Sequence, residues 1–283
     1  MSKPTVFRDS VNIKISERLT DSYTVDQRLH GLLIGKKGRT LKKLTEETGT
    51  RIHVERGTDQ VMIYGERENI EQAKIAIEKA LRQKQRPTHF LSLPIPSVHH
   101  QLEAFYSKID SVDPSAFILP ANFHITLGVM SLVDQTEVER AVRYLKEEGS
   151  KVVNDKLNGR PLDVKLERLG VMQSNPEKAH VLYIEPQDDT KRLIELCKGL
   201  TDKMIEGGFM EREKRELKLH ATIINTTYCN KKGKMRVSFD AKGILQEYGE
   251  INFGEIRLDE IHLMKMGRTG PGRTYESQGY ILI

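Results

Sequence analysis

One short pattern occurs twice in this chain and constrains its fold more than any other feature. Phe123–Leu127 reads FHITL and Leu219–Ile223 reads LHATI, so each copy is His-x-Thr between apolar residues. Single polar residues alternating with apolar ones are typical of a strand with one buried face. Alternate residues of a strand lie about 6.5–7 Å apart on the same face, so each copy presents an imidazole beside a hydroxyl. Two such strands facing each other would surround one small anion.

These four polar side chains suit cleavage of a phosphodiester. Displacement at phosphorus needs a base for the attacking oxygen and an acid for the leaving oxygen. Imidazole, with an unperturbed pKa of about 6.5, can serve in either role, so we predict His124 and His220 as the catalytic pair. The hydroxyls of Thr126 and Thr222 can donate to the non-bridging phosphate oxygens. Since no carboxylate cluster accompanies the motifs, the arrangement requires no metal and no cofactor.

A single His-x-Thr segment would be interpreted as an ordinary strand histidine. A second copy, 96 residues further along in the same apolar context, favours a functional pair. His262, within the apolar segment Ile261–Met264, has no such partner motif and is interpreted as structural.

Residues 88–283, with these two motifs, resemble the two-histidine phosphoesterase superfamily. The resemblance implies an α+β, bilobal fold with pseudo-twofold symmetry, in which antiparallel sheets line a central cleft. It also implies metal-independent action on RNA ends, 2′,3′-cyclic phosphates or 2′,5′ linkages. By motif position, it gives catalytic roles to His124 and His220 and phosphate-binding roles to Thr126 and Thr222. Some members of the superfamily keep the motifs while serving to bind nucleotides.

The apolar patterns of this part favour an α+β domain with a largely antiparallel sheet. We expect strands at 89–93, 123–130, 162–171, 180–185, 218–225, 254–266 and 280–283. Helices are expected at 97–109, 135–149 and 189–207.

The N-terminal part carries a glycine loop, Gly35-Lys36-Lys37-Gly38, between two short helices. The order predicted from about residue 17 is strand, helix, loop, helix, strand, strand, helix. The last helix, 67–83, carries an apolar stripe of Ile70, Ala73, Ile77 and Leu81. Glycines permit close backbone approach, and the N–H groups that begin the second helix can bind a phosphate.

The frame from Leu33 to Val54 resembles the type I KH domain, and the resemblance covers about residues 15–84. It implies that single-stranded RNA crosses the loop and lays its bases on an apolar groove. Leu41 and Val54 are further groove candidates, and the sequence does not separate groove from core. The alternative, a helical hairpin with an incidental loop, is disfavoured by the strand-strand-helix continuation. The predicted RNA-binding residues are Ile34, Gly35, Lys36, Lys37, Gly38, Arg39 and Ile52.

The distribution of charge agrees with this division. Residues 1–84 contain 17 Lys and Arg against 12 Asp and Glu, whereas residues 85–283 contain 28 of each. All the excess positive charge therefore lies in the part predicted to bind a polyanion. We predict an N-terminal arm at 1–15, a KH domain at 16–84 and a phosphoesterase domain at 88–283. A basic, glycine-rich loop at 265–273 either guides RNA or is a solvated hairpin loop.

Cys197 and Cys229 form neither a disulfide framework nor a zinc-ligand spacing. No apolar run is long enough to span a membrane, and the N-terminus lacks a secretory pattern, so we expect an intracellular protein without membrane contact. The joined architecture, with THFL at 88–91 and KLHAT at 218–222, resembles a family of transcription-coactivator subunits. That resemblance implies a nuclear protein acting with a helicase subunit in coactivation and alkylation-damage repair.

Three functions therefore remain open: an RNA phosphodiesterase, a non-catalytic RNA- or nucleotide-binding module, and an adaptor that holds a helicase complex. The intact motif pair favours the enzyme. The natural substrate, the RNA sequence preference, the docking segment, the oligomeric state and the assignment of acid and base among the histidines stay open.

Overall fold

The structure, a computed structural model, describes residues 19–25, 27–84, 86–213, 215–229, 237–267 and 270–283. The predicted arm at 1–15 lies outside these residues. Backbone contacts divide the chain into two compact units, residues 1–85 and 86–283.

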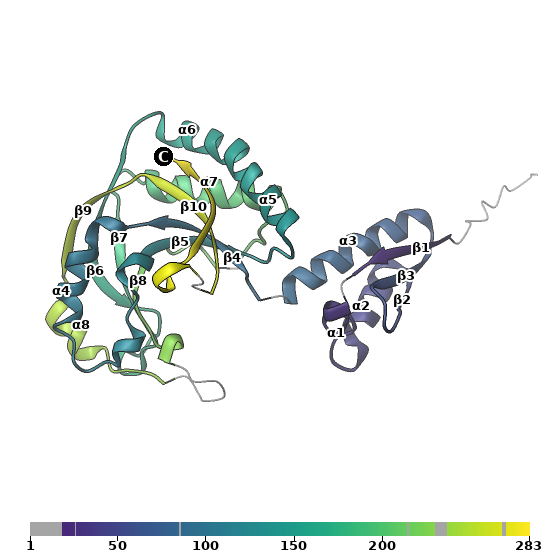
Figure 1. The fold of residues 1–283 in the computed structure, drawn as a ribbon, viewed down its shortest axis with the longest axis horizontal. Coiled ribbons are helices and arrows are strands. Elements are labelled where there is room, and N and C mark those ends of the chain that lie inside the picture. The colour runs from purple at the N-terminus through teal and green to yellow at the C-terminus, as the bar shows by residue number, and fades with distance from the viewer. Residues whose placement is uncertain (1–18, 26, 85, 214, 230–236, 268–269) are drawn as a thin grey trace, which may run out of the picture. The chain divides into compact units, whose positions relative to one another are not determined.

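The first unit has the predicted βααββα order (Figure 1). Its three strands form an antiparallel sheet in the order β1-β3-β2, with the last strand in the centre. Two short 3-10 turns, Gln27–Leu29 and Lys36–Gly38, precede the first two helices. The elements are β1 Leu19–Thr24, α1 His30–Ile34, α2 Arg39–Thr48, β2 Arg51–Val54, β3 Gln60–Gly65 and α3 Arg67–Lys84.

The core of this unit lies between the sheet and the helices. Val61 and Ile63 of β3 are fully buried together with Leu33 of α1. The stripe predicted on α3 is confirmed, since Ile70, Ala73, Ile77 and Leu81 are all buried in the same cluster.

The second unit contains one sheet of eight antiparallel strands in the order β11-β10-β4-β5-β8-β7-β6-β9, curled into a half-barrel (Figure 1). Its strands are β4 His89–Pro94, β5 His124–Met130, β6 Leu162–Val171, β7 Val181–Gln187, β8 Ala221–Asn225, β9 Asn252–Leu258, β10 Glu260–Lys265 and β11 Glu276–Leu282. Its α-helices are α4 His99–Tyr106, α5 Gln135–Tyr144, α6 Ser150–Leu157, α7 Arg192–Glu206 and α8 Lys242–Tyr248.

This sheet consists of two halves of four strands, β11-β10-β4-β5 and β8-β7-β6-β9. The halves meet at β5 and β8, the strands that belong to the two His-x-Thr motifs. Their registered contact is one residue pair, Ile125 with Ala221. The predicted bilobal arrangement is therefore confirmed, with the two lobes sharing a continuous sheet.

Two predicted boundaries were wrong for local reasons, and one helix was not predicted. Residues 254–266 form two strands, because the chain reverses at Asp259 and passes from β9 in one half to β10 in the other. The helix expected to end at Gly149 continues through a π turn, Leu145–Gly149, into α6. A Cβ at Gly149 would lie 2.9 Å from Leu145 Cδ1 and 3.3 Å from Ile281 Cδ1, so this glycine permits close packing and is not a stop. Helix α8 was not predicted.

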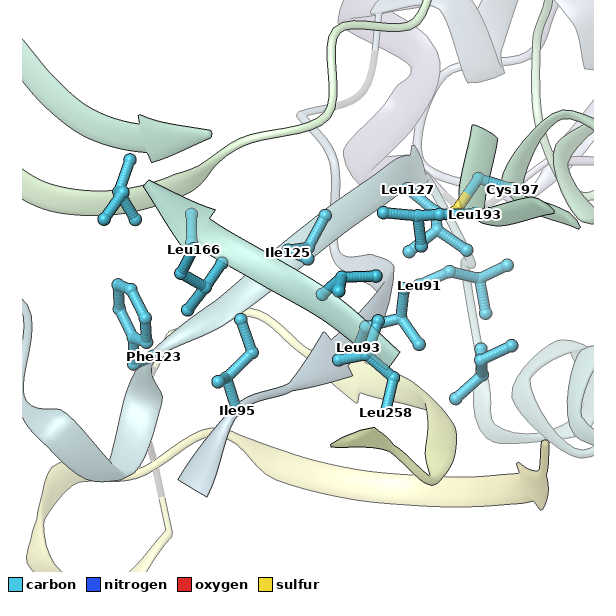
Figure 2. Close-up of a cluster of buried hydrophobic side chains, with 14 of the residues drawn as sticks. Leu91, Leu93, Ile95, Phe123, Ile125, Leu127, Leu166, Leu193, Cys197 and Leu258 are labelled. Carbon is cyan, nitrogen blue, oxygen red and sulfur yellow. The ribbon is translucent and has the colours of Figure 1, made fainter. Parts of the chain in front are cut away.

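The core of the second unit lies between one face of the sheet and helices α4 to α8, all of which contribute buried side chains to it. Figure 2 shows Phe123, Ile125 and Leu127 of the first motif region in one apolar cluster with Leu91 and Leu166. Cys197 of α7 joins this cluster, and burial raises the pKa of its thiol. Both cysteines are free. Among the described residues, no helix combines the length and the apolar character that crossing a membrane demands.

Candidate active site

The four predicted catalytic side chains meet at the junction of the two half-sheets. Along β5, Ile125 and Leu127 turn into the core, so His124 and Thr126 point to the opposite face (Figure 2). In an antiparallel pair, the contact of Ile125 with Ala221 places His124 beside Thr222 and Thr126 beside His220. All four are partly exposed, while Ile125 and Ala221 beneath them are fully buried. The site is thus built on sheet positions, with one His-Thr pair from each half.

Both histidines are held by the same local hydrogen bond. The Nδ1–H of His124 donates to the carbonyl oxygen of Asn122 at 2.6 Å, and that of His220 donates to the carbonyl of Lys218 at 2.8 Å. A carbonyl oxygen only accepts, so Nδ1 carries the proton and Nε2 has the free lone pair of the neutral ring. His124 Nε2 lies 3.0 Å from Thr126 Oγ1 and accepts its hydroxyl proton. The atom that would exchange a proton with substrate is therefore Nε2 in both rings.

The two imidazoles differ in their electrostatic environment. Burial lowers the pKa of His124 to about 4, helped by the nearby His220 and opposed by the bond to Asn122. Burial also lowers the pKa of His220, the Lys218 ammonium adds to this, and the backbone bond to Lys218 opposes it. Because both pKa values lie below 6.5, the neutral form of both rings predominates at pH 7 before an anion binds.

Aromatic rings enclose His124. Phe90 of β4 lies 5.1 Å from its ring and Tyr275 lies 5.5 Å from it in an edge-to-face arrangement, as centroid distances. Phe90 and Tyr275 themselves pack edge to face at 5.0 Å. Neither residue was predicted from the sequence. Phe90 directly precedes Leu91 in the strand, so its place on the face opposite to Leu91 and Leu93 could have been predicted. Tyr275 had no local signal.

A different set surrounds His220. The ring of Tyr183, on β7, packs edge to face against His220 at 5.4 Å. The ammonium of Lys218 lies 4.6 Å from the Tyr183 ring centroid and donates to the Tyr183 hydroxyl, with Glu185 3.9 Å away. Gly170 makes room for this ring, since a Cβ there would lie 2.5 Å from Tyr183 Cζ. Lys218 could have been predicted as a site residue, because it stands two positions before His220 in an extended segment.

His262 has both ring nitrogens engaged, Nδ1 by Ser277 Oγ at 2.8 Å and Nε2 by Glu260 at 2.7 Å. Its ring also stacks on Tyr280, which agrees with the structural interpretation. Within the residues that the structure describes, no three His, Cys, Asp or Glu side chains are grouped to hold a metal ion.

The glycine loop of the first unit has the backbone that its sequence implies. Gly35, Lys37 and Gly38 have φ values of 71°, 54° and 72°. A Cβ at Gly35 would lie 2.2 Å from Thr40 Oγ1, so the loop packs too closely for any other residue. Lys36, Lys37 and Arg39 are exposed around the start of α2, whose N-cap, Gly38, offers no side-chain cap. The start of α2 thus has no side-chain cap, an arrangement that suits the binding of an anion.

The apolar RNA-binding candidates separate in the structure. Ile34 is 38% exposed at the end of α1, next to the glycine loop. Ile52 is 7% exposed and belongs to the core of the unit, so little of its surface can contact RNA. Leu41 and Val54 are partly buried against the same core. Of the basic loop at 265–273, residues 268–269 lie outside the described residues, and Pro271–Arg273 forms a 3-10 turn.

Comparisons with known proteins agree with this geometry. A family model described as AKAP7 2'5' RNA ligase-like domain matches residues 87–283, and one described as KH domain matches residues 20–79. Activating signal cointegrator 1 complex subunit 1 of Mus musculus is 28% identical, over 86% of this chain and 81% of its own length. It is the cointegrator-complex subunit to which the joined architecture is similar.

Two further similarities concern the C-terminal unit. A-kinase anchor protein 7 isoform gamma of Homo sapiens is 24% identical, over 65% of this chain and 55% of its own length. A crystal structure of E.coli LigT complexed with 3'-AMP is similar at 16% identity and a TM-score of 0.44, covering 70% of this chain and 99% of that one.

Proposed function

We propose that this chain, which belongs to the AKAP7 2'5' RNA ligase-like domain family, is an RNA-binding phosphodiesterase. Its KH domain holds single-stranded RNA, and its C-terminal domain hydrolyses a phosphodiester without a metal ion. One observation carries the proposal. Two imidazoles, each with Nδ1 fixed by the carbonyl two residues earlier, lie on one face of the sheet, each beside a threonine hydroxyl.

The environments of the two histidines favour His124 as the general base and His220 as the general acid. His124 has the lower pKa and stays neutral, so its Nε2 takes the proton of the attacking water. The charge of a bound phosphodiester raises the pKa of His220 and lets it carry the proton that the leaving ester oxygen needs. The hydroxyls of Thr126 and Thr222 donate to the non-bridging oxygens, where negative charge grows in the transition state. The products are a phosphomonoester and an alcohol, with one water consumed.

The substrates that we propose are RNA ends, 2′,3′-cyclic phosphates or 2′,5′ linkages. Two imidazoles and two hydroxyls provide enough hydrogen-bond donors and acceptors for one phosphodiester group, which carries a single negative charge. The KH domain supplies affinity for RNA through Gly35, Lys36, Lys37, Gly38 and Arg39, with Ile34 lining the groove beside them.

The similarity to a cointegrator-complex subunit supports a proposed cellular setting. We propose that the chain is a nuclear protein of such a complex, with a helicase subunit as partner, in transcription coactivation and alkylation-damage repair. The assignment can be tested by capture of a helicase from nuclear extract with the tagged chain. The capture should be lost when a fragment of the chain is used instead.

A panel of short RNAs tests the activity directly. The RNAs carry 2′,3′-cyclic phosphate, 2′,5′-linked or 3′-hydroxyl ends, and products are identified by mass spectrometry in excess EDTA. We expect cleavage of at least one class, and no cleavage by the chain with both His124→Gln and His220→Gln. If the intact chain binds every RNA and cleaves none, it is a binding adaptor instead.

A further inference from the structure

Asn122 is a buried amide directly before the first motif. It ends the 3-10 turn Pro120–Asn122 and is 4% exposed. Its side chain makes two hydrogen bonds to a distant backbone segment. Nδ2 donates to the carbonyl oxygen of Arg273 at 3.0 Å, and Oδ1 accepts from the backbone N–H of Tyr275 at 3.0 Å. These two bonds clamp residues 273–275 to a segment about 150 residues earlier in the chain.

The clamp and the catalytic ring are connected on two sides. The carbonyl of Asn122 accepts the Nδ1–H of His124, and the clamped Tyr275 places its ring edge to face against the same imidazole. The hydroxyl of Tyr275 lies 3.3 Å from that of Tyr228, which follows β8 in the other half-sheet. The orientation and the burial of His124 therefore both depend on contacts that pass through Asn122.

The second motif shows that the local turn does not itself need this amide. Lys218 occupies the equivalent position before His220, and its carbonyl makes the same bond to Nδ1. Its side chain, however, is exposed and turns to Tyr183. The side chain of Asn122 is thus specific to the first half-site, where it binds backbone alone.

We infer that Asn122 is a positioning residue for His124, because it fixes the imidazole through its carbonyl and, by clamping residues 273–275, holds the Tyr275 ring against it. The inference rests on the proposed catalytic role of His124, but its central measurement does not need activity. Without the side-chain clamp, Tyr275 loses its anchor, and water reaches the imidazole.

Among the residues that the structure describes, few other groups around His124 could produce the same effect. His220, from the opposite half-sheet, is the titratable neighbour that lowers the pKa of His124, and the other polar neighbours are the hydroxyls of Tyr275 and Thr126. Phe90, packed on the ring from β4, carries no charge. Exposure of the ring to water is therefore the change that the clamp controls.

The test compares Asn122→Ala and Tyr275→Ala with the intact full-length chain. A control, Asn175→Ala, removes another asparagine side chain that accepts a backbone N–H, at 3.0 Å from Glu177. The titration of His124 is followed by NMR, with its ring signal assigned by loss in His124→Gln. We expect the pKa of His124 to rise from about 4 toward 6.5 in both test variants and to stay unchanged in the control.

The rate profile gives a second readout. If the pKa of His124 reaches 6.5, only about one tenth of the base is neutral at pH 5.5, so kcat/KM falls about tenfold there and little at pH 7.5. A folded Asn122→Ala chain with an unchanged His124 titration and an unchanged profile overturns the inference. If Asn122→Ala does not fold, as judged by circular dichroism, Tyr275→Ala decides by the same criterion. A shifted titration in a chain that cleaves no RNA supports the positioning role and counts against the proposed function alone.

Discussion

Removal of the two lysine charges from the KH loop tests whether this loop binds the RNA backbone. Lys36 and Lys37 are exposed beside the two loop glycines, and within the described residues neither makes an ion pair. Each is therefore free to neutralise one RNA phosphate. The change Lys36→Gln with Lys37→Gln removes both charges and leaves Gly35 and Gly38 in place.

The expected magnitude follows from counterion release. Each phosphate contact to single-stranded RNA contributes about 0.7 to the slope of log K against log salt, so loss of two contacts lowers the slope by about 1.4. Between 50 and 200 mM salt, the intact chain should lose about sevenfold more affinity than the variant. Fluorescence anisotropy with a long single-stranded RNA measures this. Hydrolysis of a dinucleotide, too short to span both domains, should be unchanged.

A matched control exists on α2, the helix that follows the loop. Lys42 and Lys43 lie within ion-pair distance of Glu46 and Glu47, at 3.8 and 3.5 Å. Their replacement by Gln changes the net charge equally but should leave the salt slope within about 0.3 of the intact chain. Equal slopes for both double variants would refute the reasoning, since the loop lysines would then contribute only general charge.

Three further predictions concern the second unit. His124→Gln or His220→Gln should each lower kcat by at least about 100-fold and the double change by little more, because the rings act as one unit; stopped assays in EDTA check this. Thr126→Val and Thr222→Val should each weaken transition-state binding by about 1–3 kcal/mol, read as kcat/KM, and unchanged values would mean structural hydroxyls. Because the pKa of His124 is about 4 when folded and about 6.5 when unfolded, the unfolded chain binds the extra proton below pH 6.5. Stability should therefore fall by about 2 kcal/mol from pH 7 to pH 5, and His124→Gln should remove that loss in urea unfolding.

The sequence predicted those parts of the fold and site that depend on local pattern. Period-two alternation located both motif strands, and the glycine frame gave the order of the KH elements. Local pattern was insufficient where packing against distant residues decides the structure. Gly149 is a residue type that often ends a helix, yet it lies inside a continuous helical segment. A glycine is required there because the side chains of Leu145 and Ile281 pack closely against its backbone.

The residues that surround the histidines could not be predicted as a set from local sequence patterns. Phe90, Tyr183 and Tyr275 come from three separate segments that only the sheet brings together. Asn122 had no signal, since an asparagine before a strand is ordinary turn chemistry. Its significance depends on a partner 151 residues away.

The order of strands in the second sheet has a consequence for protein synthesis. The half that carries His220 is built from consecutive chain, residues 162–258, whereas the half that carries His124 combines β4 and β5 with β10 and β11. During synthesis His124 leaves the ribosome early, but its half-sheet cannot form until the last two strands have been made. The hydrogen bonds of Asn122 to residues 273–275 likewise form only then. A premature stop after β9 would leave one half-site complete and the other without two of its four strands. A truncation of about 25 residues, far in sequence from either motif, would thus remove half of the half-sheet that carries His124.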